Sequence, residues 1–215
     1  MGIVREDLVA KTDVPDIVVG RLPLYLRSLT QMREEGLEIT SSQELGARLG
    51  ISSAQIRKDL SQFGEFGKQG TGYNIDFLIE QLRRILHVDR IWDVALIGVG
   101  DLGRAVAHYG GFVDRGYRIA LIFDNDPAKI GTTVGPYSVL DTANLEQELK
   151  ERGIKVAMLS VPARDAQEVT ERIINAGIQF ILNYAPTSLS VPENVHVEYI
   201  DPVLHLQHMT FYAED

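Results

Sequence analysis

Three glycines stand in the middle of the chain at spacings that suit phosphate binding. Gly98, Gly100 and Gly103 follow a short apolar segment, residues 92–97, and begin a run with helical spacing. In a strand, turn and helix of this kind, the first glycine permits a tight turn, the second lets a ligand approach the backbone, and the third allows close packing. The pattern therefore predicts a dinucleotide whose phosphates lie at the start of the helix. The predicted contacts are Gly98, Val99, Gly100, Asp101, Leu102 and Gly103.

A carboxylate ends the next apolar segment. Asp124 follows residues 117–123 and lies about 20 residues beyond Gly103, where a dinucleotide-binding fold places the acid that binds the ribose hydroxyls. Its charge, with Asp126 nearby, would repel the 2′-phosphate of NADP(H). We therefore expect NAD(H) as the cofactor. An acidic strand end that is merely solvated is the alternative interpretation.

Apolar strands and helical runs alternate through the rest of this half. Further strands are predicted over 156–161 and 180–182, each followed by a polar turn or a helix. This alternation indicates a parallel sheet, in which ligands bind beyond the carboxyl ends of the strands. Position alone therefore adds Val161, Pro162, Ala163, Asn183 and Ala185 to the predicted cofactor contacts.

The N-terminal half contains two short helices in close succession. Ser41 and Glu44 have the spacing of a capping box, which predicts a helix that ends at Gly50. A second helix is predicted over 53–63 after a tight connection. Two helices joined in this way are typical of a helix-turn-helix, although other small helical proteins give the same pattern.

The second of these helices carries long polar side chains away from its apolar face. Such side chains donate hydrogen bonds to base edges and phosphates when a helix enters the major groove of DNA. Asp59 is expected to interrupt this basic face. The predicted DNA contacts in the two helices are Ser41, Ser53, Gln55, Arg57, Lys58, Ser61 and Gln62.

The flanking segments complete a winged helix. Residues 64–73 are rich in glycine with aromatic residues at both ends, which predicts a β-wing whose Lys68 and Gly70 contact a phosphate or the minor groove. Asn74 is predicted to cap a linker helix, and an amphipathic helix is predicted over 21–35.

Composition limits the classes of protein that fit. The chain has 215 residues, of which 45% are hydrophobic and 24% charged, as in two small globular domains. No apolar run reaches the roughly 18 residues that span a bilayer, and the N-terminus lacks a signal-peptide pattern, so we expect a cytoplasmic protein. The absence of cysteine excludes disulfides and thiolate zinc sites, and we expect no metal site and no membrane partner.

Charge is distributed unevenly between the two halves. The formal net charge is -9, which argues against nonspecific coating of nucleic acid. Residues 91–215 contain 17 acidic and 9 basic residues, whereas residues 1–90 are nearly balanced with 13 and 12. This asymmetry fits a half that faces DNA and an acidic half held away from it, although a solvated acidic domain would look the same.

A catalytic centre is not evident. None of the 5 histidines stands in a recognisable motif with a Lys, Asp or Arg partner, and the nucleotide fold uses the residues that a substrate domain would need. We therefore predict a binding protein with no catalytic residues, in which the dinucleotide is a signal. A small NAD-dependent oxidoreductase and a winged-helix regulator that binds coenzyme A are the alternatives.

Several motifs together resemble one family. Residues 56–64, 67–73 and 98–103 resemble the Rex family of redox-sensing transcriptional repressors, and the resemblance covers nearly the whole chain. Residues 123–131 and 182–186 are similar to that family's nucleotide-site segments. The resemblance adds Asn125, Lys129 and Tyr184 to the cofactor contacts.

The resemblance implies a function and an architecture. It implies a homodimer that binds a palindromic double-stranded operator when NADH is scarce, releases it when NADH accumulates, with NAD+ competing, and catalyses no reaction. The implied fold is α/β, with a winged helix-turn-helix domain over 1–88 and a Rossmann domain over 89–200. A helix that is swapped between subunits, with its tail, follows over 201–215.

The resemblance also implies a polar relay between the domains, formed by Arg21, Tyr109 and Asp201. The C-terminal segment has apolar residues at helical spacing, which fits packing on another subunit or folding back on its own domain. Two positions depart from the family pattern. Pro202 replaces an aromatic residue of some relatives near the nicotinamide, and Asp101 adds a carboxylate beside the pyrophosphate.

Overall fold

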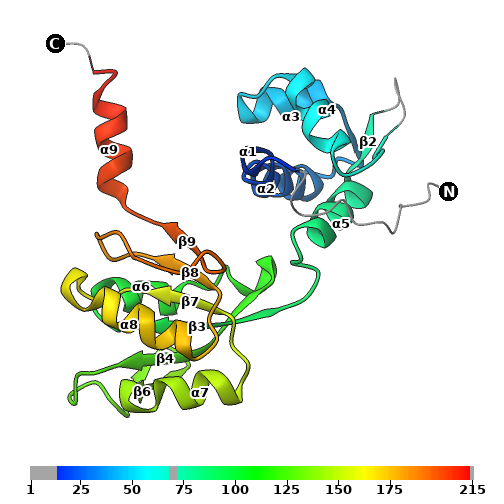
Figure 1. The fold of residues 1–215 in the computed structure, drawn as a ribbon. Helices are drawn as coiled ribbons and strands as arrows, with labels where there is room; N and C mark the ends of the chain where they lie inside the picture. Colours follow the sequence, from blue (N-terminus) through cyan, green and yellow to red (C-terminus); the bar gives the residue numbers. More distant parts are fainter. Residues whose placement is uncertain (1–13, 68–71, 214–215) are drawn as a thin grey trace. The chain divides into compact units, whose positions relative to one another are not determined.

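The chain folds into two compact units. The structure, a computed structural model, describes residues 14–67 and 72–213. Unit 1 spans Met1–Arg90 and unit 2 spans Ile91–Asp215. Figure 1 shows the helical unit 1 in blue and cyan and the sheet of unit 2 in green to orange.

Unit 1 is a small helical unit with a two-stranded sheet. Leu22, Tyr25 and Leu29 on one helix pack with Ile56 and Leu78 from two others, and all five are fully buried. This is the apolar stripe that the helical spacing predicted. The elements are α1 (Asp16–Val19), α2 (Leu22–Glu34), β1 (Ile39–Thr40), α3 (Ser42–Leu49), α4 (Ser53–Ser61), β2 (Tyr73–Asn74) and α5 (Ile75–Ile85).

The helix-turn-helix has the caps that its sequence requires. The hydroxyl of Ser41 accepts a hydrogen bond from the backbone N–H of Glu44 at 3.1 Å, and α3 ends at Gly50 in the left-handed conformation with φ +68°. Ser52 caps α4 in the same way. The second helix is shorter than predicted, because the N–H groups of Gln62 and of the residue after it bond three residues back, which tightens the last turn.

The region of the predicted wing pairs with a strand that the sequence did not reveal. β2 lies antiparallel to β1, with Thr40 opposite Tyr73. It therefore pairs with the short strand that directly precedes α3. Asn74 accepts a hydrogen bond from the N–H of Phe77 at 2.8 Å, which confirms it as the cap of α5. Lys68 and Gly70, at the predicted tip, lie outside the described residues.

Unit 2 is a doubly wound α/β fold. Its sheet has the order β5-β6-β4-β3-β7-β8-β9, and all neighbours are parallel except β5 and β6. The parallel strands therefore have the order 3-2-1-4-5-6 of a dinucleotide-binding sheet. The elements are β3 (Trp92–Ile97), α6 (Asp101–His108), η1 (Val113–Arg115), β4 (Tyr117–Asp124), β5 (Thr133–Val134), β6 (Tyr137–Asp141), η2 (Thr142–Asn144), α7 (Leu145–Glu151), β7 (Val156–Leu159), α8 (Ala163–Asn175), β8 (Phe180–Asn183), β9 (His196–Tyr199) and α9 (Pro202–Thr210).

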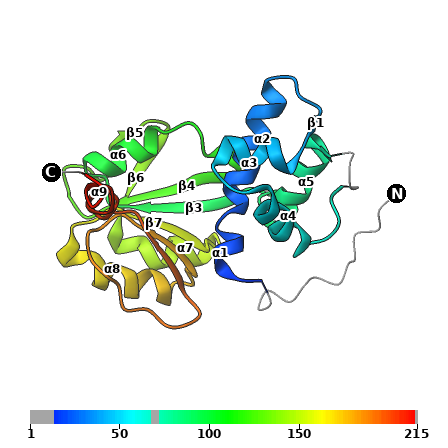
Figure 2. The ribbon, with the colours of Figure 1, turned by 90° about the horizontal axis from the view of Figure 1, so that it is seen from above.

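Helices cover both faces of this sheet. Figure 2 shows α6 on one face and α7 and α8 on the other. Alternate residues of β3 divide between the two layers: Val94 and Leu96 pack with α6, whereas Ala95 and Ile97 pack with α7 and α8. Because both faces are covered, the central strands are apolar over most of their length, apart from residues near their ends such as Asp93 and Arg118, which is why they were predictable.

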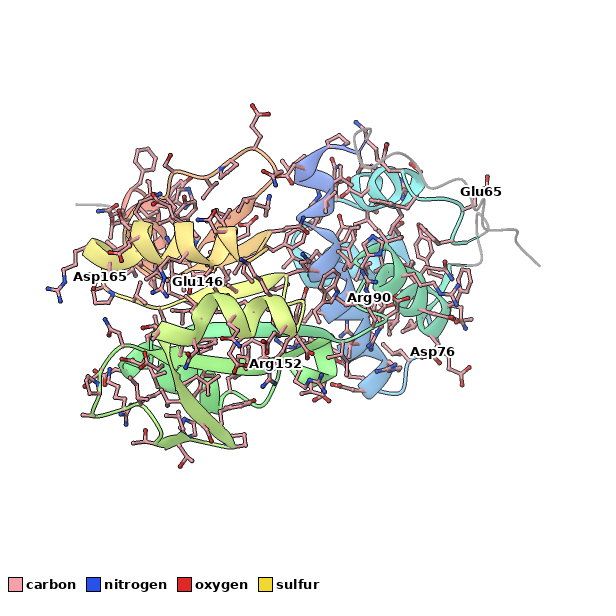
Figure 3. All side chains as sticks on the ribbon, turned by 60° about the horizontal axis from the view of Figure 1, so that its bottom comes forward. Glu65, Asp76, Arg90, Glu146, Arg152 and Asp165 are labelled. Carbon is pink, nitrogen blue, oxygen red and sulfur yellow. The ribbon has the colours of Figure 1, made fainter. Side chains whose placement is uncertain are left out.

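An ion pair joins the two helices of one face. Glu146, labelled in Figure 3, comes from α7 and accepts from the guanidinium of Arg172 on α8 at 2.6 and 2.8 Å. Arg172 also donates to the carbonyl of Thr142. The sequence analysis did not predict α7, the β5–β6 hairpin or β9, because these segments are short and their charged residues obscure the periodicity.

The C-terminal helix has no buried residue. Asp201 caps it by accepting from the N–H of Val203 at 2.9 Å, and Pro202 occupies the first turn, where its missing N–H costs nothing. Leu204 and Met209 are 59% and 64% exposed. In Figure 1, the helix extends from the end of β9. None of the helices in the described residues is long and apolar enough to cross a membrane.

The connection between α3 and α4 leaves no space for a side chain at Gly46. A Cβ added there would lie 2.3 Å from the carbonyl oxygen of Ile51. We expect Gly46→Ala to lower the free energy of unfolding by about 1–3 kcal/mol, because the turn must shift to relieve the overlap. Urea denaturation of the full chain measures this, with Gly20→Ala as the control, since a Cβ at Gly20 meets its nearest atom at 3.6 Å. Equal midpoints for the two variants would contradict the prediction.

Candidate nucleotide and nucleic-acid sites

The glycine loop after β3 is closely packed at two of its glycines and has free space at the third. Gly98 has φ +94°, and a Cβ there would lie 2.5 Å from the carbonyl oxygen of Ser160. A Cβ on Gly103 would lie 2.0 Å from the carbonyl oxygen of Gly98, whereas one on Gly100 would meet no atom within 4 Å. The loop therefore needs glycine for its own packing at two positions and offers free space at the third. This arrangement fits a phosphate-binding cradle.

Ser160 anchors this loop to the neighbouring strand, and the sequence analysis missed it. Its hydroxyl donates to the carbonyls of Gly98 at 2.8 Å and Ile97 at 3.2 Å, and its N–H bonds to Ile97 as well. These bonds end β7 at Leu159, two residues earlier than predicted. Serine directly after an apolar strand was the available signal.

The predicted cofactor residues gather at one edge of the sheet. β3 and β7 are the neighbours at which the strand order reverses, and their chains continue into α6 and α8 on opposite faces. Such a switch point is where open α/β sheets bind ligands. Val161, Pro162 and Ala163 lead from β7 into the first turn of α8, and Asp101 begins α6.

Asp124 ends β4 and is bonded to the glycine loop. Its carboxylate, 5% exposed, accepts from the N–H of Val99 at 2.7 Å, from the N–H of Asp126 at 2.9 Å and from the ammonium of Lys129 at 3.0 Å. Burial opposes ionisation, but these donors outweigh it and hold the pKa of Asp124 below its ordinary value. The carboxylate thus positions the loop, and Lys129 partly neutralises it, while Asn125 stands exposed beside them.

Asn183 shapes the loop after β8. Its amide donates to the carbonyls of Ala185 at 3.1 Å and Thr187 at 3.0 Å and accepts from the N–H of Ala185 at 2.9 Å. The side chain is 1% exposed, so its polar atoms serve the loop itself. Burial raises the pKa of the neighbouring Tyr184. A groove of 370 Å³ opens beyond this loop, lined by Asn183, Ala185, Pro186, Tyr199, Asp201 and Leu204 among others.

The exposed face of α4 is basic. Arg57 and Lys58 are exposed, and the guanidinium of Arg57 donates to the hydroxyl of Ser42 at 3.0 Å. Gln55 and Gln62 are half-buried on the same helix. The predicted serines differ in their roles, since the hydroxyl of Ser41 is a cap of α3, that of Ser61 bonds to the carbonyl of Lys58 and Ser53 begins α4.

The position expected for Asp59 was wrong. Its carboxylate is fully buried and accepts from Arg21 at 2.6 and 2.8 Å, from the Tyr25 hydroxyl at 2.6 Å and from the Gln55 amide at 2.7 Å. Burial raises the pKa of Asp59, but the bonds from Arg21, Tyr25 and Gln55 outweigh it, so the pKa lies below its ordinary value. The charge therefore faces inward and does not interrupt the basic face.

The residues of the predicted relay lie in both units. Arg21 belongs to unit 1, where Asp59 holds its guanidinium and raises its pKa. Tyr109 and Asp201 belong to unit 2: Tyr109 packs edge-on against Phe112 at 5.1 Å, and Asp201 caps α9. Their joint role stays a prediction. Within the part of the chain that the structure describes, no cluster of three or more His, Asp or Glu side chains could hold a metal ion.

Comparison with known proteins identifies the family. Residues 13–61 match a family model described as "Putative DNA-binding protein N-terminus", and residues 89–187 match one described as "CoA binding domain". The redox-sensing transcriptional repressor Rex of Roseiflexus sp. (strain RS-1) is 53% identical over 198 residues, which cover 92% of this chain and 90% of the relative. The Rex protein of Streptomyces griseus is 42% identical over 94% of this chain and 79% of its own length. The chain belongs to the Rex family.

Solved structures of Rex repressors have the same fold. The crystal structure of RSP in complex with beta-NAD+ and operator DNA matches with a TM-score of 0.89 at 35% identity, over 94% of this chain and 93% of that chain. RSP in complex with beta-NADH matches with a TM-score of 0.85 at 33% identity, over 94% of each chain. The α/β fold that the sequence indicated, a DNA-binding N-terminal part followed by a Rossmann-like domain, is therefore confirmed.

The buried hydrogen bond between Tyr25 and Asp59 is expected to support this Rex chain in a pH-dependent way. Tyr25→Phe should lower the free energy of unfolding by about 1.5–3 kcal/mol, the usual contribution of a hydrogen bond to a charged group. Because the pKa of Asp59 is lowered by folding, its ionised form stabilises the chain above about pH 4, and this contribution is lost as pH falls through the folded pKa.

Urea denaturation at several pH values between about 3 and 7 measures the free energy of unfolding of wild type and of Tyr25→Phe. The difference between the two free energies should be largest near neutral pH and should decrease in acid. Tyr117→Phe, in the sheet of unit 2, is the control, because Tyr117 lies in a different unit from Asp59. A difference between wild type and Tyr25→Phe that stays constant with pH would contradict the prediction.

Proposed function

We propose that this Rex-family repressor is a homodimer that binds a palindromic double-stranded operator when NADH is scarce and releases it when NADH accumulates. The observation that carries the proposal is that one chain contains two structural features, each suited to one of the two ligands. One is the glycine cradle bonded to Asp124, and the other is the capped helix-turn-helix with a basic outer face.

The DNA-binding role rests on α4 and its surroundings. A recognition helix needs exposed donors that reach base edges and phosphates, and α4 presents Arg57 at its centre and Lys58 in its last turn. The inward orientation of Asp59 removes the one opposing charge from this face. The proposed contacts are those expected from the sequence: Ser41, Ser53, Gln55, Arg57, Lys58, Ser61, Gln62, Lys68 and Gly70.

The cofactor role rests on the cradle between β3 and α6. Backbone N–H groups at the start of α6 would hold the pyrophosphate, and the end of β4 would bind the ribose. When bound, the dinucleotide supplies a nicotinamide ring that is cationic in NAD+ and neutral in NADH. In the groove beyond β8, Ala185, Pro186 and Leu204 favour the neutral ring, because desolvation of a cation is costly, whereas the carboxylate of Asp201 in the same lining favours the cation.

The proposed contacts to NAD(H) are Gly98, Val99, Gly100, Asp101, Leu102, Gly103, Asp124, Asn125, Lys129, Val161, Pro162, Ala163, Asn183, Tyr184 and Ala185. Asp124 and Asn183 act mainly by holding their loops, since their side chains bond to their own chain.

Coupling between the two ligands follows from linkage. NADH releases DNA only if it binds a DNA-incompetent arrangement of the dimer more tightly than the competent one. Operator DNA must then weaken NADH binding by the same factor. We propose that Arg21, Tyr109 and Asp201 form the relay between the two arrangements.

The dimer interface is proposed to include α9. The helix exposes a series of apolar side chains, and a helix of this kind is stable when another surface covers it. The proposed division is a winged-helix domain over 1–88, a Rossmann domain over 89–200 and a swapped helix with its tail over 201–215. We propose that the protein acts in the cytoplasm, where a bacterial chromosome lies.

The chain is a regulator by family, and we propose that it catalyses no reaction. Coenzyme A is the second candidate ligand, because the model that matches residues 89–187 is described as a coenzyme A binding domain. Coenzyme A carries a 3′-phosphate on its ribose, and the carboxylates of Asp124 and Asp126 at the end of β4 disfavour it.

One experiment tests the function directly. Selection from a library of randomised duplex DNA by the full-length protein supplies its binding site, and gel shifts on that duplex are then titrated with NADH, NAD+, NADPH or coenzyme A. We expect NADH to weaken DNA binding by about 5- to 150-fold and NADPH and coenzyme A to leave it nearly unchanged. Equal DNA affinity with and without NADH would refute the proposed coupling.

A variant separates DNA binding from cofactor binding in this experiment. Arg57→Ala should lose DNA binding while NADH fluorescence still shows binding, because Arg57 lies on α4 in unit 1 and the cradle lies in unit 2. Loss of both activities would indicate misfolding of the variant instead.

Asp124 and Lys129 should set cofactor preference in opposite directions. Asp124→Ala removes the charge that repels a 2′-phosphate and frees Lys129 to attract it, so the preference for NADH over NADPH should fall by about tenfold or more. Lys129→Met should raise this preference. Both affinities are measured by calorimetry for each variant. The affinity of Asp124→Ala for NADH should also fall, since the bond to Val99 is lost, but a preference ratio equal to that of wild type would remove Asp124 from this role.

A further inference from the structure

The recognition helix contains a buried carboxylate whose partners include a predicted DNA contact. Asp59 has no exposed surface, and its Oδ1 accepts from both Arg21 at 2.8 Å and the Nε2 of Gln55 at 2.7 Å. Its Oδ2 accepts from Arg21 and from Tyr25, both at 2.6 Å. A carboxylate with four donors in a protein interior is held in one orientation, because an alternative would leave buried polar groups unpaired.

This arrangement determines how the Gln55 amide is oriented. An ionised carboxylate only accepts hydrogen bonds, so the NH2 group of Gln55, and not its carbonyl, must face Asp59. The reverse orientation would bring two acceptors together at 2.7 Å. One N–H and the carbonyl oxygen of Gln55 are then left for another partner.

The position of Gln55 makes these two groups accessible. It is the third residue of α4, in the N-terminal turn that a recognition helix places against base edges. The side chain is half-buried and lines an open groove of 230 Å³ together with Lys58 and Gln62. The remaining donor and acceptor therefore lie in a groove that Lys58 and Gln62 of the same helix line together with Pro15, Ile17, Val18 and Arg21.

We propose that Gln55 reads an adenine in each half of the operator and that Asp59 is the positioning residue that fixes its amide for this purpose. A free N–H beside a carbonyl oxygen is complementary to N7 and the N6 amino group of adenine in the major groove, and to no other base there. The inference rests on the proposed DNA-binding role of α4 and adds which base pair is read and how the reading group is oriented.

The negative charge in the recognition helix has a purpose in this scheme. A carboxylate near DNA opposes binding to phosphates, yet here it is buried and neutralised by Arg21. The Asp59 carboxylate therefore repels the DNA phosphates only weakly. It also restricts the rotation of the Gln55 side chain, which would otherwise have to be ordered when DNA binds.

The test compares base preference between variants of the full-length protein. The probe is a library of randomised duplex DNA, followed by single duplexes with each base pair at every selected position. Wild type should select A·T at one position in each half-site, with about 5- to 150-fold discrimination. Gln55→Ala should make the four base pairs equivalent at that position while the other positions keep their preferences.

One further variant should gain a new base preference at this position, and another should lose part of the existing preference. Gln55→Arg should change the preferred pair at the same position to G·C, because a guanidinium is complementary to the two acceptors of guanine. Asp59→Asn should reduce discrimination at that position alone, since an amide can donate as well as accept and no longer fixes the Gln55 orientation. Thermal unfolding of each variant measures whether unit 1, which contains both substituted residues, keeps its fold.

Gln31→Ala is the matched control, because Gln31 is an exposed glutamine of α2 outside the proposed DNA contacts and should not change that position's preference. Retention of the wild-type preference in both Gln55 variants overturns the inference, as does an equal loss of binding to every duplex, which would mean that Gln55 is only structural. If wild type itself selects no sequence, the proposed function fails as well, so the two failures are distinguishable.

Discussion

A buried carboxylate must be surrounded by donors, and this requirement organises both units of the chain. Removal of an ionised group from water is so unfavourable that it persists only where several N–H or O–H groups converge on it. Asp59 in unit 1 and Asp124 in unit 2 both meet this condition. Each side chain ties a segment with a proposed binding role, α4 or the glycine loop, to a neighbouring element. These two groups therefore restrict the positions of both segments.

The glycine loop shows how the sheet and the site depend on each other. Its backbone is held by hydrogen bonds from Ser160, directly after the adjacent strand, and to Asp124, and neither contact covers the side where Gly100 has free space. Both contacts come from strand ends, because a parallel sheet aligns the carboxyl ends of its strands along one edge. The order of strands in the sheet therefore decides which side chains can support the loop.

Much of this arrangement could be predicted from residue types and spacing. The strand and glycines at 92–103, the capping roles of Ser41 and Asn74 and the strand ending in Asp124 each rest on a local signal, and the structure has them. The inward orientation of Asp59 was missed although its spacing gave a hint. It stands three residues after Ile56 and one before Leu60, on the buried face of α4, and only the partner Arg21, distant in sequence, makes that position acceptable. Asn183 was predicted as a ligand contact because of its place after a strand, whereas its bonds to Ala185 and Thr187 depend on how the following loop folds.

In the proposed dimer, the exposed α9 would make the stability of the protein depend on its concentration. Leu206, 56% exposed, and Phe211, 81% exposed, lose contact with water only when some surface covers them. Any such cover that comes from a second molecule obeys mass action, so the melting temperature of the protein rises with the amount present. Dilution of such a dimer would release single chains, so measurements made at nanomolar and at micromolar protein would report on different populations.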